Sequence, residues 1–303
     1  MDTHTLLRNL QPPKGDFDVV LDTDTYNEID DQYAIAYLLG KKQANVLALC
    51  AAPFLNEKSV SPADGMEKSY QEILKVLRIA GREDMIERTH RGSEHYLPDE
   101  KTPVDSSAAR KLLELAKAHS PEHPLYVACI GCITNVASAL LMEPSIAENI
   151  VIAWAAFNAP HWPDNHEFNL MQDVAAGRVV MNSGCPVVLL PAFDVVSHFI
   201  VSGAELDLWL RGKNALCDYL VENTFQEVSS YHGRVWSRII WDVVTVAWLF
   251  NDGDRFMRAR IAPAPIPQYD HHQSFDPTRH PHASVWTIDR NAILQDLVDT
   301  LTK

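Results

Sequence analysis

Acidic side chains near the N-terminus are the residues of this sequence best suited to chemistry. No Lys or Arg lies between Lys14 and Lys41, whereas seven acidic residues do: Asp16, Asp18, Asp22, Asp24, Glu28, Asp30 and Asp31. Crowded carboxylates are costly, because two charges ~4 Å apart repel by ~4 kcal/mol at an effective dielectric near ~20. A bound divalent cation would offset this repulsion, and all-oxygen ligands favour Ca²⁺ or Mg²⁺ over zinc. The spacing therefore predicts a metal site, with a solvated acidic loop as the alternative.

The elements around these acids indicate an α/β fold. Residues 17–22 are expected to form an apolar strand, the acids follow in a loop, and residues 30–39 are expected to form a helix. Further strands are expected at residues 45–52, 125–130, 150–156 and 187–190, with helices between them. Short apolar strands separated by helices predict an open, mostly parallel, Rossmann-like sheet covered on both faces. Because such sheets bind ligands beyond the carboxyl ends of their strands, the acidic loop lies where a site is expected.

The C-terminal third has a different pattern. After Pro191, helices are expected at residues 204–210, 215–229 and 240–250, followed by a Pro- and His-rich segment over residues 262–282. A strand over residues 284–288 and a helix over residues 291–301 complete the chain. The Pro- and His-rich segment is the one candidate domain boundary, and a functional loop explains it equally well. We therefore predict a single domain over residues 1–303.

Composition argues against several classes of protein. The 40 acidic against 26 basic residues give a net charge of −14, which disfavours nucleic acids and anionic membranes as partners. The longest apolar run, residues 150–157, is far below the ~18 residues of a transmembrane helix. Residues 1–15 lack the apolar core of a signal peptide. The five cysteines are scattered in a chain that needs no bridges, so reduced thiols and a cytoplasmic location are predicted.

Two known metal-site patterns fit the acidic loop poorly. An EF-hand requires glycine at its sixth position and glutamate at its twelfth. Counted from Asp22, these positions hold Asn27 and Tyr33, which excludes an EF-hand. A haloacid dehalogenase-like phosphatase also begins with a strand and an Asp-x-Asp pair, but Tyr26 stands where Thr or Val is usual. This second pattern is weakened and is kept as an alternative.

A third pattern fits better. The stretch VVLDTDTYNEIDDQYAIAYLL resembles the signature of the inosine-uridine nucleoside hydrolase family, in which a strand ends in Asp-x-Asp and a helix opens with Asp-Asp. Asp22, Asp24, Asp30 and Asp31 stand in the matching places. The loop is two residues longer than the usual form of the family and lacks its glycine.

Further segments resemble the same family in the same order. CIGCITNVA is similar to a stretch whose threonine, here Thr134, offers its main-chain carbonyl to calcium. HEFNLMQD contains the Glu-Phe-Asn motif, with Glu167 and Asn169 in the family's ribose- and metal-binding places. IIWDVVTVAWL is similar to a His-Asp-Pro element, with the metal ligand at Asp242 and Trp241 in place of the histidine. The closing RNAILQDLVDTL resembles the family's terminal helix, so the resemblance extends from about residue 17 to the C-terminus.

This resemblance implies a calcium-dependent enzyme that hydrolyses the N-glycosidic bond of ribonucleosides, as in purine and pyrimidine salvage, and that forms a homodimer or homotetramer. The implied calcium ligands are Asp24, Asp30, Asp31, the carbonyl of Thr134, and Asp242. Asp24 is also the implied general base, taking a proton from the attacking water. The implied substrate contacts are Asn56, Glu167, Asn169, Trp241 and His161. Because an indole cannot serve as the acid, Trp241 either stacks on the base or belongs to the core. His161 or His166 would then supply the proton, or the base would depart without protonation by the protein.

Several alternatives stay open at this point. A Mg²⁺-dependent haloacid dehalogenase-like phosphohydrolase and a non-catalytic ribose- or nucleoside-binding protein both remain possible. Cys129-x-x-Cys132 is expected to be a pair of inert buried thiols, because zinc would need two more ligands at workable spacing. The histidines of the Pro- and His-rich segment, His271, His272, His280 and His282, are expected in a mobile loop that closes over substrate.

Overall fold

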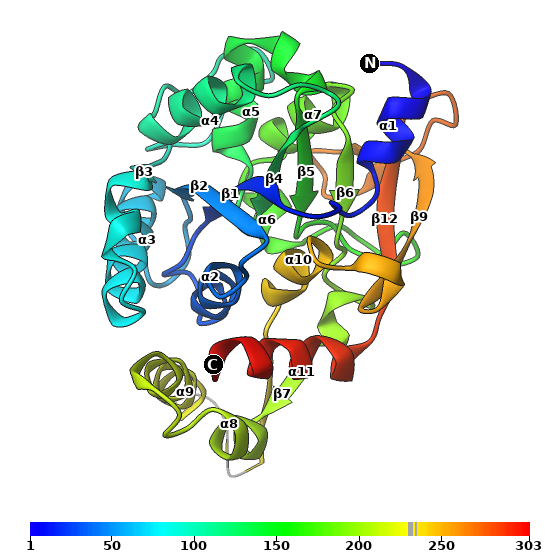
Figure 1. Cartoon of the computed structure of the whole chain (residues 1–303). Coiled ribbons are helices and arrows are strands. Elements are labelled where there is room, and N and C mark those ends of the chain that lie inside the picture. The colour runs from blue at the N-terminus through cyan, green and yellow to red at the C-terminus, as the bar shows by residue number, and fades with distance from the viewer. Residues whose placement is uncertain (230–232, 234) are drawn as a thin grey trace.

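An eight-stranded sheet forms the centre of the molecule in the computed structural model, which describes residues 1–229, 233 and 235–303 (Figure 1). Its strand order is β3-β2-β1-β4-β5-β6-β12-β9. The strands are β1 (Phe17–Thr23), β2 (Ala44–Ala51), β3 (Thr89–Arg91), β4 (Leu125–Cys129), β5 (Ile150–Trp154), β6 (Val187–Leu189), β9 (Met257–Pro263) and β12 (Pro281–Ile288). All neighbours pair in parallel except β9 and β12, which are antiparallel. The predicted open, mostly parallel sheet is confirmed.

The direction of the strand order reverses beside β1. From β1 the chain proceeds through β2 to β3 on one side, and it then returns to place β4 on the other side of β1. In open α/β sheets, ligands bind beyond the carboxyl ends of the strands at such a reversal. The segments that follow Thr23 and Cys129 meet at this position.

Helices cover both faces of the sheet (Figure 1). One face carries α4 (Ser107–Lys117), α5 (Thr134–Met142) and α7 (Val174–Asn182), and the other carries α2 (Asp31–Leu39), α10 (Val243–Trp248) and α11 (Arg290–Leu301). Alternate residues of a strand point to opposite faces, so Val20 packs in one core cluster while Val19 and Leu21 pack in the other. Burial on both sides explains why these strands are apolar throughout.

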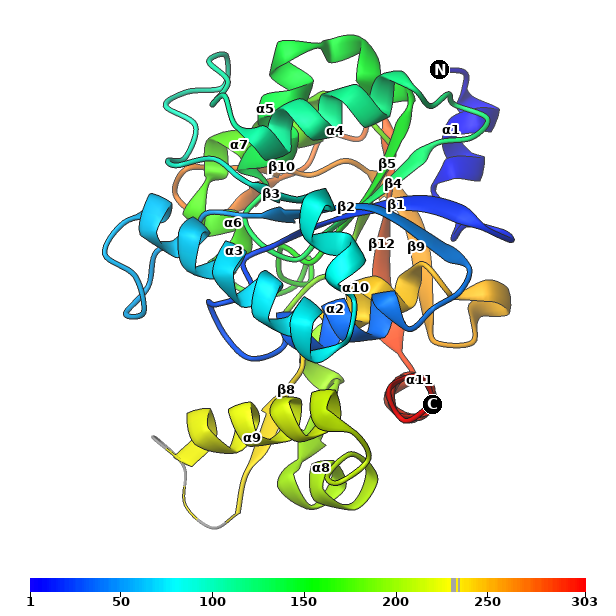
Figure 2. The same cartoon turned by 60° about the vertical axis from the view of Figure 1, so that its left-hand side comes forward.

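The remaining helices lie at the periphery. α1 (Thr3–Asn9) precedes the sheet, α3 (Pro62–Ile79) packs beside β2 and β3, and the short α6 (Phe168–Gln172) directly precedes α7. Ser61 caps α3, because its hydroxyl accepts a hydrogen bond from the Asp64 N–H. α8 (Gly203–Trp209) and α9 (Ala215–Ser229) project below the α2 and α11 layer, together with the small sheet of β7 (Ile200–Ser202) and β8 (Ser237–Ile239) (Figure 2).

The C-terminal third departs from the sequence-based prediction in two places. The helix expected over residues 240–250 begins only at Val243, because β8 and a short turn occupy the preceding residues. The Pro- and His-rich segment contains the end of β9, the short pair β10 (Ile266–Pro267) and β11 (Gln273–Ser274), and the start of β12. All five cysteines are buried and unpaired. No helix in the described part of the chain combines the length and apolar character needed to cross a membrane.

Candidate active site

Three carboxylates from two helix starts meet at the reversal of the strand order. Asp30 and Asp31 open α2, and Asp242 directly precedes α10. One carboxylate oxygen of each residue lies within 4.8 Å of the others, and all three side chains are buried. The Asp242 N–H donates a 3.4 Å hydrogen bond to Asp30 Oδ2, which holds the two loops together. The dipole at the start of α2 favours the charged forms of Asp30 and Asp31.

Asp24 lies beside this cluster, at the end of β1. Its side chain is 1% exposed, and neither carboxylate oxygen has a hydrogen-bond partner among the described residues. The loop after β4 approaches it closely at Gly131, where a Cβ atom would lie only 3.0 Å from Asp24 Cγ. A larger residue at position 131 would therefore require Asp24 to shift by a few tenths of an ångström. Buried oxygens without partners are rare in proteins and indicate a ligand that the carboxylate receives.

The clustered carboxylates hold their protons more tightly than isolated ones do. Burial raises the pKa of Asp24, and the negative charges of Asp31 and Asp30 raise it further. Burial also raises the pKa of Asp242, together with the charges of Asp30 and Asp31. Burial raises the pKa of Asp31 to about 7, although a hydrogen bond from the Thr23 hydroxyl opposes the shift. A divalent cation would oppose these shifts by favouring the charged carboxylates, and the all-oxygen donor set suits Ca²⁺ or Mg²⁺.

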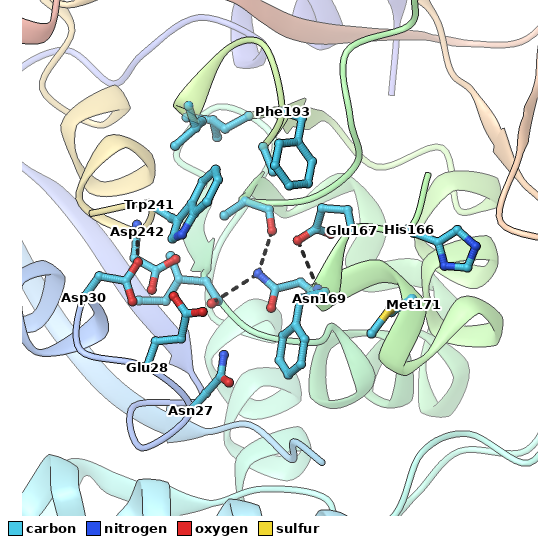
Figure 3. Close-up of a pocket in the computed structure, with 16 residues that line it drawn as sticks. Asn27, Glu28, Asp30, His166, Glu167, Asn169, Met171, Phe193, Trp241 and Asp242 are labelled. Atoms are coloured by element: carbon cyan, nitrogen blue, oxygen red, sulfur yellow. Dashed lines mark hydrogen bonds between the residues drawn. The ribbon is translucent and has the colours of Figure 1, made fainter. Parts of the chain in front are cut away.

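A cavity of about 310 Å³ opens beside the cluster (Figure 3). Polar residues line the side next to the acids: Asn27, Glu28, Asp30, Glu167, Asn169 and Asp242. Phe168, Phe193 and Trp241 are the largest side chains among the remaining lining residues, most of which are apolar. The cavity thus joins a carboxylate-rich region to an apolar one, which suits a ligand with a polyhydroxylated part and a flat apolar part.

Glu167 and Asn169 are fixed rigidly by the backbone around them. Both oxygens of Glu167 accept backbone hydrogen bonds, Oε1 from Asn169 at 3.0 Å and Oε2 from Leu170 at 2.9 Å and Phe157 at 3.3 Å. Asn169 Nδ2 donates to the carbonyls of Ala155 at 2.8 Å and Ile130 at 3.3 Å. These bonds tie α6 to the ends of β4 and β5. Burial raises the pKa of Glu167 to about 7, while its backbone hydrogen bonds lower it.

Aromatic rings form one corner of the cavity. Phe193, in the loop after β6, lies 5.8 Å from the Trp241 ring at an interplanar angle of 79°. Phe193 also stacks on Trp162, with ring centroids 5.2 Å apart at 10°. Trp241 is half-buried, and it both lines the cavity and packs against the core.

Thr134 lies apart from the cavity. It is the first residue of α5, and its hydroxyl donates a 2.6 Å hydrogen bond to Asp173 Oδ2. The residue of the same loop that lines the cavity is Ile130, whose carbonyl accepts the hydrogen bond from Asn169. Of the two residues, Ile130, which directly follows β4, is therefore the one at the cavity wall.

Asn56 and His161 also lie outside the cavity lining. Asn56 Nδ2 donates to Asn27 Oδ1 at 2.7 Å, so it orients a lining residue. His161 is exposed, and its Nε2 pairs with Asp194. His166 does line the cavity, but its imidazole points away from the acids (Figure 3). Its ring packs against that of His271, with centroids 4.1 Å apart. Of the predicted site residues, Asp24, Asp30, Asp31, Asp242, Glu167, Asn169 and Trp241 are thus the ones that the fold gathers around the cavity and its acidic cluster.

Sequence reasoning assigned no role to Glu28, which lies in the longer part of the acidic loop. Its carboxylate lines the cavity and forms an ion pair with Arg238 of β8. Arg238 also contacts Glu227 of α9 at 3.3 Å. The sequence did contain one indication of Glu28, namely the two extra residues of the acidic loop. Added length after a strand end can bring a new side chain to the site.

Comparisons with known proteins agree with this geometry. The sequence model of a family described as inosine-uridine preferring nucleoside hydrolase matches residues 19–287. The chain is 26% identical over 240 residues to a pyrimidine-specific ribonucleoside hydrolase, RihA, of Citrobacter koseri, covering 69% of this chain and 75% of the relative. It is 25% identical over 229 residues to a probable uridine nucleosidase 2 of Arabidopsis thaliana, covering 67% of each. A purine-preferring ribonucleoside hydrolase from Gardnerella vaginalis has the same fold, with a TM-score of 0.76 at 16% identity over 94% of this chain and 98% of that one.

Proposed function

Because the chain belongs to the inosine-uridine preferring nucleoside hydrolase family, we propose that it cleaves the N-glycosidic bond of ribonucleosides to free base and ribose with calcium at its acidic cluster. The observation that carries this proposal is the position of Asp24. Its two buried oxygens have no partner among the described residues, and they lie beside three further carboxylates at the reversal of the strand order. This combination suits a cation and a water that are to be placed next to a bound sugar.

The residues that would hold calcium are Asp24, Asp30, Asp31 and Asp242. We assign the backbone ligand to the carbonyl of Ile130 in place of Thr134, because Ile130 lines the cavity. When bound, calcium would polarise the attacking water and the ribose hydroxyls. Calcium is preferred to magnesium because carboxylates and a carbonyl from separate loops suit its irregular coordination.

The chain's own residues then have separate tasks. Asp24 accepts the proton of the water that attacks C1′, since a carboxylate with free oxygens can act as a general base. Asn169 and Glu167 hold the ribose hydroxyls, and their hydrogen bonds to the backbone keep them in place. The carboxylates around the sugar stabilise the positive charge that develops on it in an oxocarbenium-like transition state.

The apolar region of the cavity would receive the base. Trp241 and Phe193 offer aromatic surface at that end, and Trp241 directly precedes the metal-binding Asp242. A ribonucleoside would therefore place its sugar at the acids and its base against the rings. The carboxylate-rich wall disfavours the phosphoester that a phosphohydrolase would have to bind.

A nucleoside panel tests the proposal. Each nucleoside is incubated with the calcium-loaded protein, and both free base and reducing sugar are measured, with a chelator-treated sample as control. We expect equal amounts of base and sugar in calcium and none after chelation. Saturable binding without release of either product would identify a nucleoside-binding protein, and release of phosphate from phosphoesters would identify a phosphohydrolase.

We also propose that residues 1–303 act as one domain, because the site combines residues that lie far apart in the chain, from Asp24 to Asp242. The homodimer or homotetramer and the cytoplasmic location remain predictions. Sedimentation and fractionation would test them.

A further inference from the structure

The wall of the cavity is negatively charged. Four carboxylate residues line it, namely Glu28, Asp30, Glu167 and Asp242, and none of the described lining residues is Lys or Arg. Asp24 and Asp31 add charge directly behind the wall. Arg238 neutralises part of it through its ion pair with Glu28. Even with a divalent cation bound, the ionised site therefore retains net negative charge, and it attracts a positively charged ligand more than a neutral one.

The aromatic corner of the cavity, formed by Trp241 and Phe193, also favours a positively charged ligand. The faces of aromatic rings carry negative potential, and tryptophan binds cations more strongly than the other aromatic residues do. Trp241 and Phe193 meet nearly edge to face, so two rings border one corner of the cavity. Phe193 is in turn supported by the stacked Trp162. A flat cation at this corner would contact π-electrons on one side and lie close to the carboxylates on the other.

A proton donor is missing where a neutral base would need one. When the glycosidic bond of a neutral nucleoside breaks, the departing nitrogen must receive a proton. Trp241 cannot donate as an acid at neutral pH, and the imidazole of His166 points away from the acids (Figure 3). Both oxygens of Glu167 already accept backbone hydrogen bonds. Neither of the two rings that border the aromatic corner, Trp241 and Phe193, can therefore act as the acid.

From these three observations, and resting on the function proposed above, we propose that the preferred substrates are ribosides whose base is already a cation, such as N-ribosylpyridinium compounds and N7-alkylated purine ribosides. In the reaction the C1′–N bond breaks and its electron pair goes to the ring nitrogen, which becomes neutral. The oxygen of water bonds to C1′, and the proton of that water passes to Asp24 and then to solvent. The base leaves without being protonated, so no acid is required.

Turnover of matched substrates is the first test. The calcium-loaded protein is given nicotinamide riboside against uridine and inosine, and N7-methylguanosine against guanosine, and each kcat/KM is divided by the spontaneous rate of hydrolysis. We expect the corrected value to be at least tenfold higher for the cationic member of each comparison.

Inhibition by two uncleavable C-ribosides isolates the effect of charge. One is 3-ribosyl-1-methylpyridinium, a cation, and the other is 3-ribosyltoluene, which has the same shape and no charge. We expect the cation to have an inhibition constant at least tenfold lower, a ratio that corresponds to about 1.4 kcal/mol. Trp241→Leu and Phe193→Leu should each reduce this ratio, whereas Trp286→Leu, which removes a half-exposed indole of β12 outside the cavity, should leave it unchanged.

The inference holds only if both preferences are found. If neutral nucleosides are cleaved with equal or higher corrected efficiency, or if the two C-ribosides inhibit equally, the cation preference is refuted while the hydrolase function stands. If no riboside of either charge releases base and sugar, the proposed hydrolase function itself fails.

Discussion

Without divalent cations, the protein should become less stable as the pH rises, which is the reverse of the usual effect of carboxylates on stability. Asp31 shows the direction in which the free energy of unfolding changes with pH. Burial raises its pKa from 3.8 to about 7 in the folded protein, so the folded state holds the proton more tightly than the unfolded state. Its contribution to the free energy of unfolding is therefore greatest below pH 4, decreases between pH 4 and 7, and is constant above that range. Asp24, Asp30 and Asp242 act in the same direction.

The size of the effect follows from the shift. The difference between 3.8 and about 7 is about 3 pH units for Asp31, and each unit corresponds to ~1.36 kcal/mol, so this residue alone accounts for about 4 kcal/mol. Calcium at ~100 times its dissociation constant would restore ~2.7 kcal/mol. For a chain of this size, that energy corresponds to a melting-temperature difference of roughly 4 °C. The difference should be largest near pH 8 and smallest near pH 5, where protons compete with calcium.

Melting curves at several pH values between 5 and 8, recorded in calcium, in magnesium and in a chelator, measure this effect. Asp22→Asn is the matched control. Burial raises the pKa of Asp22 to about 7 as well, but its Oδ1 accepts a 2.8 Å hydrogen bond from Asn135, away from the cluster. The variant should therefore weaken the pH dependence equally in calcium and in chelator. A melting temperature that does not fall as the pH rises in chelator, or a calcium effect that is the same at pH 5 and pH 8, would show that the buried carboxylates do not destabilise the metal-free protein.

Four further changes test individual residues. Asp24→Asn should lower turnover at saturating calcium at least ~10²–10⁴-fold, the usual cost of losing a general base, while the protein still folds; near-normal turnover of the folded variant would remove Asp24 from the mechanism. Trp241→Ala should weaken binding of aromatic nucleosides more than binding of ribose, as titration calorimetry can show; equal losses with a large drop in melting temperature would assign Trp241 to the core alone. Glu167→Gln should raise KM and lower the unfolding free energy by ~1–3 kcal/mol, because the amide nitrogen cannot accept the backbone hydrogen bonds; an unchanged KM would exclude ribose contact. Arg238→Met should destabilise by an amount between the ~1 kcal/mol of an exposed pair and the ~3–5 kcal/mol of a buried one, and adding Glu28→Gln should recover part of it; a double variant that is as unstable as the single one would show that the pair is not coupled.

The acidic residues of the site could be predicted from the sequence because their spacing is local. Asp24, Asp30 and Asp31 fall between one strand and one helix, and the fold rule for parallel sheets places that connection at the ligand-binding edge. The apolar strands likewise predicted a sheet that is buried on both faces. These inferences depend on residue type and order over a few tens of residues, which a sequence displays directly.

Other parts of the site depend on contacts that the sequence does not display. A backbone carbonyl is present at every position, so residue types alone could not tell that Ile130 and not Thr134 reaches the cavity. The pair between Glu28 and Arg238 joins positions 210 residues apart. Phe193 lies in an irregular loop, whose course is set by tertiary hydrogen bonds such as the one from its N–H to Asn158 Oδ1. Such positions follow from packing rather than from local pattern.

The distribution of the cluster along the chain also determines when it can form during folding. The carboxylates of the cluster and of the neighbouring Asp24 come from residues 24, 30, 31 and 242, and the last of them arrives only when α10 packs against α2. During synthesis, a nascent chain that ends before Asp242 cannot assemble the cluster, so repulsion among its three early carboxylates is not relieved. Contacts between such distant segments form late, because closing a long loop costs entropy before any contact compensates it. An ion bound here therefore slows unfolding of the finished protein more than it speeds folding, so its effect is on the lifetime of the native state.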